Sequence, residues 1–334
     1  MSGSMFSALA ALIGFAVTAL LGFVMIPFLR KLKFGQTIRE DGPQWHQSKQ
    51  GTPTMGGLMF IIGFVAAMAI CFPIFMKVVG GETNTTVTKI VAGMILACGM
   101  GLCGFLDDFI SIKKHRNLGL TEIQKLILQF AFAIIYLVSI RMAGGTSEML
   151  IPFAGVVDLG IFYYIISAVF IVGMVNAVNF ADGIDGLNAS VTFVVCLCFM
   201  VTAFIMGQIG WTVFSASAAG ACIGFLVWNF NPAKVFMGDT GSLFLGGIVC
   251  AIAFGLNIPV LLILFGIVYI CEILSVVLQV SYFKATKGKR IFKMSPIHHH
   301  FELCGWNEVK ICMVFSLVAL IFGVISILLV LFGL

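Results

Sequence analysis

Ten long hydrophobic segments, separated by short polar stretches, make up most of this 334-residue chain. Each approaches the roughly 20 residues that an α-helix needs to cross the hydrocarbon layer of a membrane. We place these segments at about 5–29, 55–76, 90–106, 123–142, 159–177, 187–207, 213–228, 241–257, 258–283 and 311–334. None shows the alternation of apolar and polar residues that a membrane β-barrel requires, so the pattern predicts helices, with the seventh and eighth segments the weakest.

Composition leads to the same class of protein. Hydrophobic residues make up 60% of the chain and charged residues 10%, whereas soluble domains carry about 25% charged residues. We therefore expect an all-α polytopic membrane protein of about ten transmembrane helices, forming one integral membrane domain over residues 1–334. The ten cysteines lack metal-binding spacing, and we interpret them as small packing residues.

Lys and Arg residues are distributed unevenly between the two sets of loops, and short cytoplasmic loops are the ones that retain them. Only Lys77, Lys89 and Arg141 fall on one side. The other side holds sixteen of the nineteen basic residues: Arg30, Lys31, Lys33, Arg39, Lys49, Lys113, Lys114, Arg116, Lys125, Lys234, Lys284, Lys287, Lys289, Arg290, Lys293 and Lys310. This asymmetry predicts that both termini lie outside and that the basic loops face the cytoplasm. Those loops would contact anionic lipid headgroups, a substrate, or both.

Acidic residues gather on the same predicted cytoplasmic side. Five of the seven aspartates lie there at the ends of apolar segments: Asp107, Asp108, Asp182, Asp185 and Asp239. Buried or half-buried carboxylates cost several kcal/mol unless they are paired or bound to a metal. A convergent set of carboxylates at a membrane surface therefore indicates a cation-dependent site for an anionic substrate.

Asp107 and Asp108 are adjacent at the inner end of the third segment. Neighbouring carboxylates repel one another unless a cation offsets their charge, so such a pair often borders a divalent ion or a proton-transfer step. A solvated helix end is the alternative interpretation. Lys125 and the other nearby basic residues would either neutralise the two acids or hold a phosphate.

Asn176, Asn179, Asp182 and Asp185 follow one another at intervals of three residues. That spacing places side chains on one face of a 3₁₀ turn, or on a slowly drifting face of an α-helix. Helix capping explains one such residue well but explains four poorly. A glycine follows each aspartate and would let the backbone approach a ligand closely.

Residues 229–242 join the seventh and eighth segments. Pro232 would end the incoming helix, and Gly238 would begin a turn into the next helix, whose free N–H groups favour an anion. Asp239 would lie beside that anion, so a cation would be needed, and Mg²⁺ fits because it shares oxygen ligands with substrate phosphates. Phe236 would either pack in the protein or stack on a base.

Three consecutive histidines, His298 to His300, occupy the last basic loop. Their spacing does not suit a zinc site, but imidazoles near a phosphate can stabilise developing charge. Surface histidines without a function are the alternative.

Glu272 lies inside the ninth segment, where an ionisable side chain marks either a functional site or an interhelical hydrogen bond. The length of that segment also suggests a break that opens a groove for a lipid chain.

Five short motifs occur in a fixed order along the chain. They are GTPTMGG at 51–57, the Asp107–Asp108 pair, NxxNxxDGIDGL from Asn176, FMGDTGS at 236–242 and PIHHHFE at 296–302. In these motifs, over essentially its whole length, the chain resembles the phospho-N-acetylmuramoyl-pentapeptide transferase family of the polyprenyl-phosphate N-acetylhexosamine-1-phosphate transferase superfamily. One departure is Ser111, which stands where the family often has a lysine.

The resemblance implies Mg²⁺-dependent transfer of phospho-MurNAc-pentapeptide from UDP-MurNAc-pentapeptide to undecaprenyl phosphate, with release of UMP. This is the first membrane step of peptidoglycan synthesis, and it implies a multi-pass homodimer in the bilayer of the bacterial inner membrane, with no nucleic-acid partner. Four residues are implied in catalysis: Asp107, Asp108, Asp239 and His298. Of these, Asp239 is also implied as the metal ligand. Twelve are implied in substrate binding: Lys49, Thr54, Lys125, Asn176, Asn179, Asp182, Asp185, Asn229, Phe236, Gly238, His299 and His300.

Two other functions stay open. A GlcNAc-1-phosphate transferase of the same superfamily would share most of these motifs, although the PIHHHFE segment disfavours it. A transporter would place its ionisable residues near the bilayer midplane and between inverted repeats, rather than at the ends of spans. Within the transferase interpretation, direct attack by the lipid phosphate and a two-step route through an aspartyl intermediate also stay open, and we favour the direct route.

Overall fold

Ten helices in the described part of the chain are long and apolar enough to cross a membrane. The computed structural model describes residues 3–32, 49, 51–78, 84–113 and 119–333. The ten helices are α1 (Gly3–Lys31), α2 (Gly57–Val78), α3 (Asn84–Lys113), α4 (Glu122–Met142), α5 (Ile161–Phe180), α6 (Leu187–Ile205), α7 (Ile209–Asn229), α8 (Gly238–Gly255), α10 (Ile267–Ala285) and α12 (Glu308–Gly333). Each of the ten predicted hydrophobic segments thus lies largely within one of these helices, and the ninth differs most because only its later part belongs to α10. Lys33, Arg39, Lys114 and Arg116 lie outside the described residues.

The all-α prediction was wrong at one place, between α4 and α5. Strands β1 (Glu148–Ile151) and β2 (Gly155–Asp158) form an antiparallel hairpin in which Met149 pairs with Val157. Each strand has only four residues. Such short apolar runs are far below the length of a span, so the sequence pattern gave no reason to separate them from a loop.

Helices α7 and α8 form the centre of the bundle. In each of them 83% of the most apolar stretch is buried inside the protein, compared with 22% in α12. Because they face other helices rather than lipid, they tolerate many small and polar residues, which explains why they were the weakest predicted spans. A side chain at Gly220 of α7 would overlap the backbone of α1 at Ala11, so small residues set this close packing.

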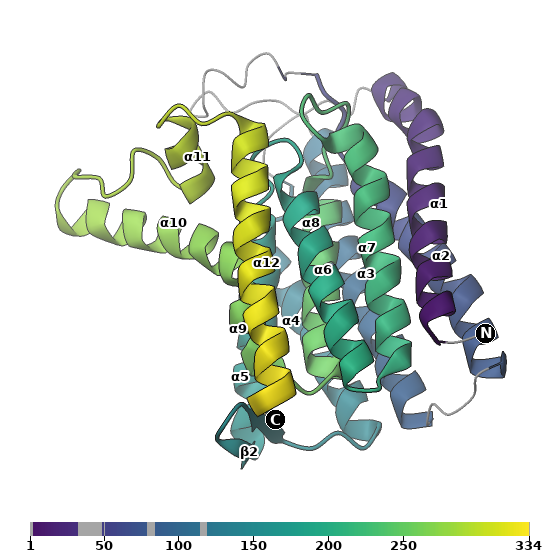
Figure 1. The fold of residues 1–334 in the computed structure, drawn as a ribbon. Helices are drawn as coiled ribbons and strands as arrows, with labels where there is room; N and C mark the ends of the chain where they lie inside the picture. The colour runs from purple at the N-terminus through teal and green to yellow at the C-terminus, as the bar shows by residue number, and fades with distance from the viewer. Residues whose placement is uncertain (1–2, 33–48, 50, 79–83, 114–118, 334) are drawn as a thin grey trace.

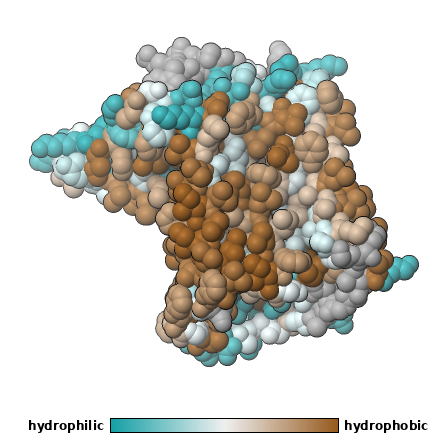
Figure 2. Space-filling view, viewed as in Figure 1, coloured by the Kyte–Doolittle hydropathy of each residue, from teal (hydrophilic) through white to brown (hydrophobic). Residues whose placement is uncertain are grey.

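The outer helices present a broad apolar surface, visible as the brown band that covers the middle of the molecule in Figure 2. Hydrophilic residues concentrate at the two ends of the bundle in the same view. Both termini and the hairpin lie at one end, whereas the α5–α6 loop, the α7–α8 loop and the short helix α11 (Ile297–Glu302) lie at the other (Figure 1). The chain therefore brings its motif-bearing loops together at the end opposite to its termini.

The ninth predicted segment is broken, as expected. It begins with the 3₁₀ helix η2 (Pro259–Leu261) and the single turn α9 (Leu262–Phe265), and α10 starts only after Gly266. Figure 1 shows α10 projecting sideways from the bundle, with α11 packed beside it on the side of the motif-bearing loops. Only the inner face of α10 is buried, and it includes Tyr269, Glu272 and Gln279.

Candidate active site

Asp108 caps the first turn of α8. Its carboxylate accepts hydrogen bonds from the Thr240 backbone N–H at 2.9 Å, the Thr240 hydroxyl at 2.6 Å and the Asp239 N–H at 3.2 Å. The first N–H groups of a helix have no partner within the helix, so a carboxylate is a suitable acceptor for them. Gly104 permits the close approach of α3, because a side chain there would overlap the Asp239 carbonyl.

This capping changes one prediction. The sequence pattern indicated free N–H groups at the start of α8 that would bind a substrate anion. The N–H groups of Asp239 and Thr240 are instead occupied by Asp108, so the anion at these two groups belongs to the protein. Asp239 is held at the first turn of α8 as a result.

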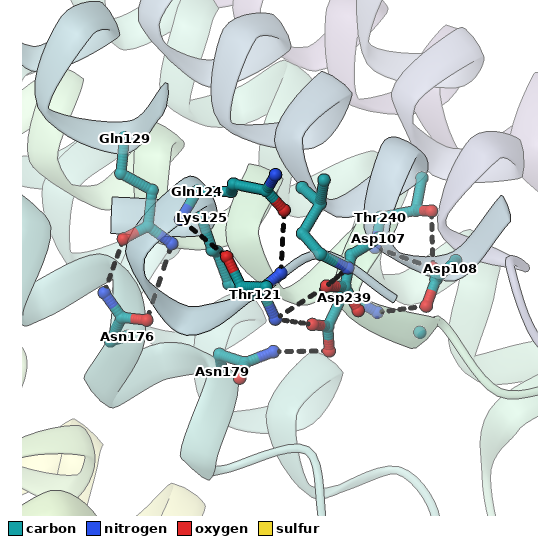
Figure 3. A network of polar contacts seen from close by, with 12 residues as sticks. Asp107, Asp108, Thr121, Gln124, Lys125, Gln129, Asn176, Asn179, Asp239 and Thr240 are labelled. Atoms are coloured by element: carbon teal, nitrogen blue, oxygen red, sulfur yellow. Dashed lines mark hydrogen bonds and ion pairs between the residues drawn. The ribbon is translucent and has the colours of Figure 1, made fainter. Parts of the chain in front are cut away.

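Lys125 bridges two of the predicted catalytic carboxylates (Figure 3). Its ammonium lies 2.6 Å from Asp239 Oδ2 and 3.3 Å from Asp107 Oδ1. The Leu120 N–H also donates to Asp107 Oδ1 at 3.0 Å, and the Asn179 amide donates to Asp239 Oδ1 at 2.9 Å. Side chains from α3, α4, α5 and α8 therefore meet in one network, although they are distant in the sequence.

The position of Lys125 follows from the way α4 begins. Thr121 is the N-cap residue, and its hydroxyl accepts the Gln124 N–H at 3.3 Å. The Gln124 side chain in turn accepts the Thr121 N–H at 3.0 Å, which completes a capping box. The helix start is thereby fixed, and Lys125 follows directly in the first turns of α4.

Asn179 and Asn176, one turn apart on α5, have different surroundings. Besides its bond to Asp239, Asn179 donates to the Ser242 hydroxyl at 2.7 Å. Asn176 instead exchanges hydrogen bonds with the fully buried Gln129 of α4, at 2.7 and 3.4 Å. The Asn176–Gln129 pair joins α4 to α5 beside the network of Figure 3, and a direct substrate contact for Asn176 stays a prediction.

A second group of charged residues, the Lys49 group, consists of Lys49, Asp185 and Glu308. The Lys49 ammonium is 2.7 Å from Asp185 Oδ1 and 2.6 Å from Glu308 Oε1. Asp185 is only 3% exposed, and it also accepts the Ala233 N–H at 2.9 Å. Glu308, at the start of α12, accepts the Asp185 N–H at 2.7 Å. Glu308 was not among the predicted site residues, although an acid in the first turn of the last span, on the side of the five aspartates, was a usable signal.

Asp182 lies between these two groups, in the loop that joins α5 to α6. Burial, followed by the negative charges of Asp239, Asp108 and Asp185, raises the pKa of Asp182 well above its usual range. Among the described residues, no side chain or N–H group donates to its carboxylate. The effect of the other three carboxylates on Asp182 indicates that all four lie near one another, in line with the expected convergence of the acids.

The remaining predicted residues of the α7–α8 loop organise its backbone. Buried Asn229 accepts the Gly186 N–H at 3.1 Å and donates to the Val235 carbonyl at 2.9 Å, so it ties this loop to the α5–α6 loop. Half-buried Phe236 exchanges backbone hydrogen bonds with the segment that carries Thr54: its N–H donates to Pro53, and Gly56 donates to its carbonyl, both at 2.8 Å.

Gly238 occupies a place that no other residue fits. Its φ is +68°, which disfavours residues with a side chain. A Cβ there would also lie 2.5 Å from Asp108 Oδ2 and 2.8 Å from the Thr54 hydroxyl. The GTPTMGG and FMGDTGS motifs and the aspartate pair therefore meet at Gly238.

The three histidines of α11 have three different environments. His298 is fully buried, with Nδ1 3.0 Å from Glu272 Oε2, and its ring lies against the backbone of Gly183. His299 Nδ1 is 2.5 Å from Glu302 Oε2, and His300 Nδ1 accepts the Lys293 N–H at 3.1 Å. Of the three rings, His298 is the one that packs against the loop of Asp182.

The donor set suits Mg²⁺. Asp107, Asp108, Asp182 and Asp239 bring four carboxylates together, and Lys125 is the one cation that contacts any of them in the described part of the chain. Within the described ranges, no group of three or more His, Cys, Asp or Glu side chains is arranged to hold a metal ion by itself. Mg²⁺ commonly uses one or two carboxylates and completes its shell with water and substrate phosphates, so oxygen donors with excess negative charge fit it.

Known proteins of one family resemble this chain over most of its length. The model of glycosyl transferase family 4 matches residues 90–257, and the phospho-N-acetylmuramoyl-pentapeptide-transferase signature 1 matches residues 49–61. A phospho-N-acetylmuramoyl-pentapeptide-transferase of Clostridium botulinum is 47% identical over 321 residues, which cover 95% of this chain and 94% of the relative. Enzymes of the same name from Halalkalibacterium halodurans and Desulfitobacterium hafniense are each 44% identical, with 96% of both chains covered.

Proposed function

The chain belongs to the phospho-N-acetylmuramoyl-pentapeptide-transferase family, and from this premise we propose how its residues carry out the reaction. The enzyme is a transferase of peptidoglycan synthesis that acts on UDP-MurNAc-pentapeptide and a polyprenyl phosphate. The products are the lipid-linked diphospho-MurNAc-pentapeptide and UMP. The observation that carries the proposed mechanism is the network in which Lys125 joins Asp107 to Asp239.

We place the active site on the cytoplasmic side of the bacterial inner membrane. The basic residues Lys49, Lys125, Lys234 and Lys310 belong to the end of the bundle that carries the motif loops, whereas Arg141 lies near the end that carries the termini. Because cytoplasmic loops retain positive charge, this distribution supports termini on the outer side. A soluble nucleotide sugar and a lipid acceptor would then meet at the inner surface.

The uridine half of the donor would bind near Lys49 and Asp185. Glu308 holds the Lys49 ammonium and the Asp185 backbone N–H, and Lys49 in turn binds the Asp185 carboxylate. Half-buried Phe236 lies in the neighbouring α7–α8 loop, where its ring is suited to stack on uracil. The diphosphate would extend from there toward Lys125, whose ammonium supplies positive charge for a phosphate. We propose this direction because Asp182, in the α5–α6 loop, lies between the charged residues around Lys49 and the network around Lys125.

Phosphoryl transfer depends mainly on charge neutralisation and alignment. Bound Mg²⁺ would neutralise charge on the diphosphate, with Asp239 as its principal protein ligand. The acceptor phosphate has a second pKa of about 6, so it is largely dianionic at neutral pH and needs no strong base. Asp107 would take its residual proton on Oδ2, to which no described residue donates a hydrogen bond, whereas Asp108 would keep α8 and Asp239 in position.

The test is release of UMP by the purified protein in detergent. UDP-MurNAc-pentapeptide, a polyprenyl phosphate and Mg²⁺ are supplied, with a chelator as the metal control. We expect UMP and lipid-linked product together, both abolished by omitting the acceptor. Faster release from UDP-GlcNAc would instead identify a GlcNAc-1-phosphate transferase, and absence of UMP with every donor would contradict the proposed reaction. A homodimer stays part of the proposal, with the mass of the purified particle as its test.

A further inference from the structure

Glu272 and His298 form a fully buried pair between α10 and α11. Both side chains have 0% exposure, and His298 Nδ1 lies 3.0 Å from Glu272 Oε2. Burying a carboxylate and an imidazole costs free energy that an apolar pair of similar size would not. The pair therefore calls for an explanation beyond packing.

The two outer atoms of the pair have no hydrogen-bond partner. Glu272 Oε1 and His298 Nε2 are both buried and unpartnered within the described residues. His298 Nε2 lies against Gly183, so closely that a Cβ on this glycine would overlap the ring. The unused nitrogen of the imidazole thus faces the loop that carries Asp182.

Glu272 determines which nitrogen is available. When the Glu272 carboxylate is ionised it only accepts hydrogen bonds, so Nδ1 then carries the proton that lies between the two groups. Nε2 is then left as the acceptor in the neutral ring, or as a donor when the ring is protonated. Fixing one nitrogen in this way also fixes the rotation of the ring.

Holding α11 in place does not require Glu272. Gln279, two turns further along α10, accepts the N–H groups of Ile291 and Phe292 at 3.0 Å and donates to the Phe292 carbonyl at 3.1 Å. These three bonds already attach the segment that precedes α11. The Glu272 carboxylate contributes something that they do not, namely a negative charge beside the His298 ring.

We propose that Glu272 is a positioning residue for the transfer reaction. It holds His298 with Nε2 directed at the α5–α6 loop and stabilises the protonated ring when charge develops on the donor diphosphate. The inference rests on the proposed function and extends it, because it adds a residue outside the network that joins Asp107, Lys125 and Asp239. Glu272 itself touches no reacting atom.

The test is Glu272→Gln, which keeps the shape and an acceptor for Nδ1 but removes the charge. We expect kcat to fall by about 10- to 100-fold, the range typical when a partner that orients a functional imidazole is lost. KM for the UDP-sugar and the thermal midpoint should stay near wild type, because the Lys49 group and the Gln279 contacts are intact. In a His298→Gln background the same substitution should cause no further loss.

Two additional variants distinguish an effect of the Glu272 charge from a purely structural effect of its side chain. Glu272→Asp keeps the charge, so it should retain more kcat than Glu272→Gln, whereas a residue that only braces α10 against α11 would show the opposite order. Ser275→Ala is the matched control, since Ser275 is buried on the same face and, among the described residues, its hydroxyl bonds only the Glu272 backbone carbonyl. Its kcat should equal that of wild type.

Three results would overturn the inference: unchanged kcat in Glu272→Gln, a loss confined to KM or thermal stability, or a full additional loss in the His298→Gln background. Failure of the proposed function is distinguishable, because the unmodified enzyme would then release no UMP from UDP-MurNAc-pentapeptide.

Discussion

Replacing Asp108 by asparagine should slow transfer severely while donor binding persists. The carboxylate accepts three hydrogen bonds from Asp239 and Thr240. The single carbonyl oxygen of asparagine cannot accept them all, and its NH₂ group would face at least one donor. A hydrogen bond to a charged group contributes about 1.5–3 kcal/mol, and the interaction of a charge with a helix end about 0.3–1 kcal/mol.

Together these contributions predict that Asp108→Asn loses roughly 2–4 kcal/mol of stabilising free energy at the start of α8. If this loss raises the free energy of the transition state, kcat should fall by about 30- to 1,000-fold, because a tenfold change in rate corresponds to about 1.4 kcal/mol. The assay is UMP release, with calorimetric binding of the UDP-sugar measured in parallel. Donor affinity should change by less than about fivefold (1 kcal/mol) because the Lys49 group lies elsewhere.

Thr240→Val is the control for this experiment. It removes the 2.6 Å hydroxyl bond to Asp108 and leaves the carboxylate and both N–H bonds in place. A loss of about 1.5 kcal/mol, the lower end for a hydrogen bond to a charged group, or roughly tenfold in kcat, is expected. Near-normal turnover of Asp108→Asn would refute the role given to Asp108, and an equal loss in both variants would show that its negative charge contributes nothing.

Three further predictions concern neighbouring charges. Asp239→Asn should abolish Mg²⁺-stimulated transfer in a metal titration, and an unchanged Mg²⁺ dependence would exclude Asp239 as the ligand. Lys125→Met should lower kcat by at least tenfold, because Asp107 and Asp239 lie within about 6 Å of each other and would repel by roughly 3 kcal/mol at an effective dielectric constant near 20; full activity in UMP release would contradict this. Glu308→Gln should raise KM for the UDP-sugar by about tenfold with little change in kcat, since it loosens Lys49; unchanged steady-state KM would show that Lys49 needs no such support.

Local sequence patterns predicted the helices well, because the length and apolarity of a span are properties of contiguous residues. The break before α10 was also predictable from the length of its segment. The β1–β2 hairpin was not, since its four-residue strands carry too few residues to show a period. The weakness of the α7 and α8 signals reflects their burial among other helices.

These local patterns do not predict which residues far apart in the sequence contact one another. The sequence indicated that Asp107, Asp108 and Asp239 converge, but not that Asp108 caps α8 or that Lys125 lies between the other two acids. The same limit applies to Glu272 and His298, which are 26 residues apart. Each such contact depends on helix packing, which no local period encodes.

The most direct test of the central claim is to locate a divalent ion in the enzyme bound to its UDP-sugar. Mn²⁺ can replace Mg²⁺ and be identified by its anomalous scattering. We expect one ion at roughly 2.1 Å from an Asp239 carboxylate oxygen, shared with the diphosphate and close to Asp107 and Lys125. An ion bound away from Asp239, or a diphosphate that contacts none of these residues, would contradict the central claim.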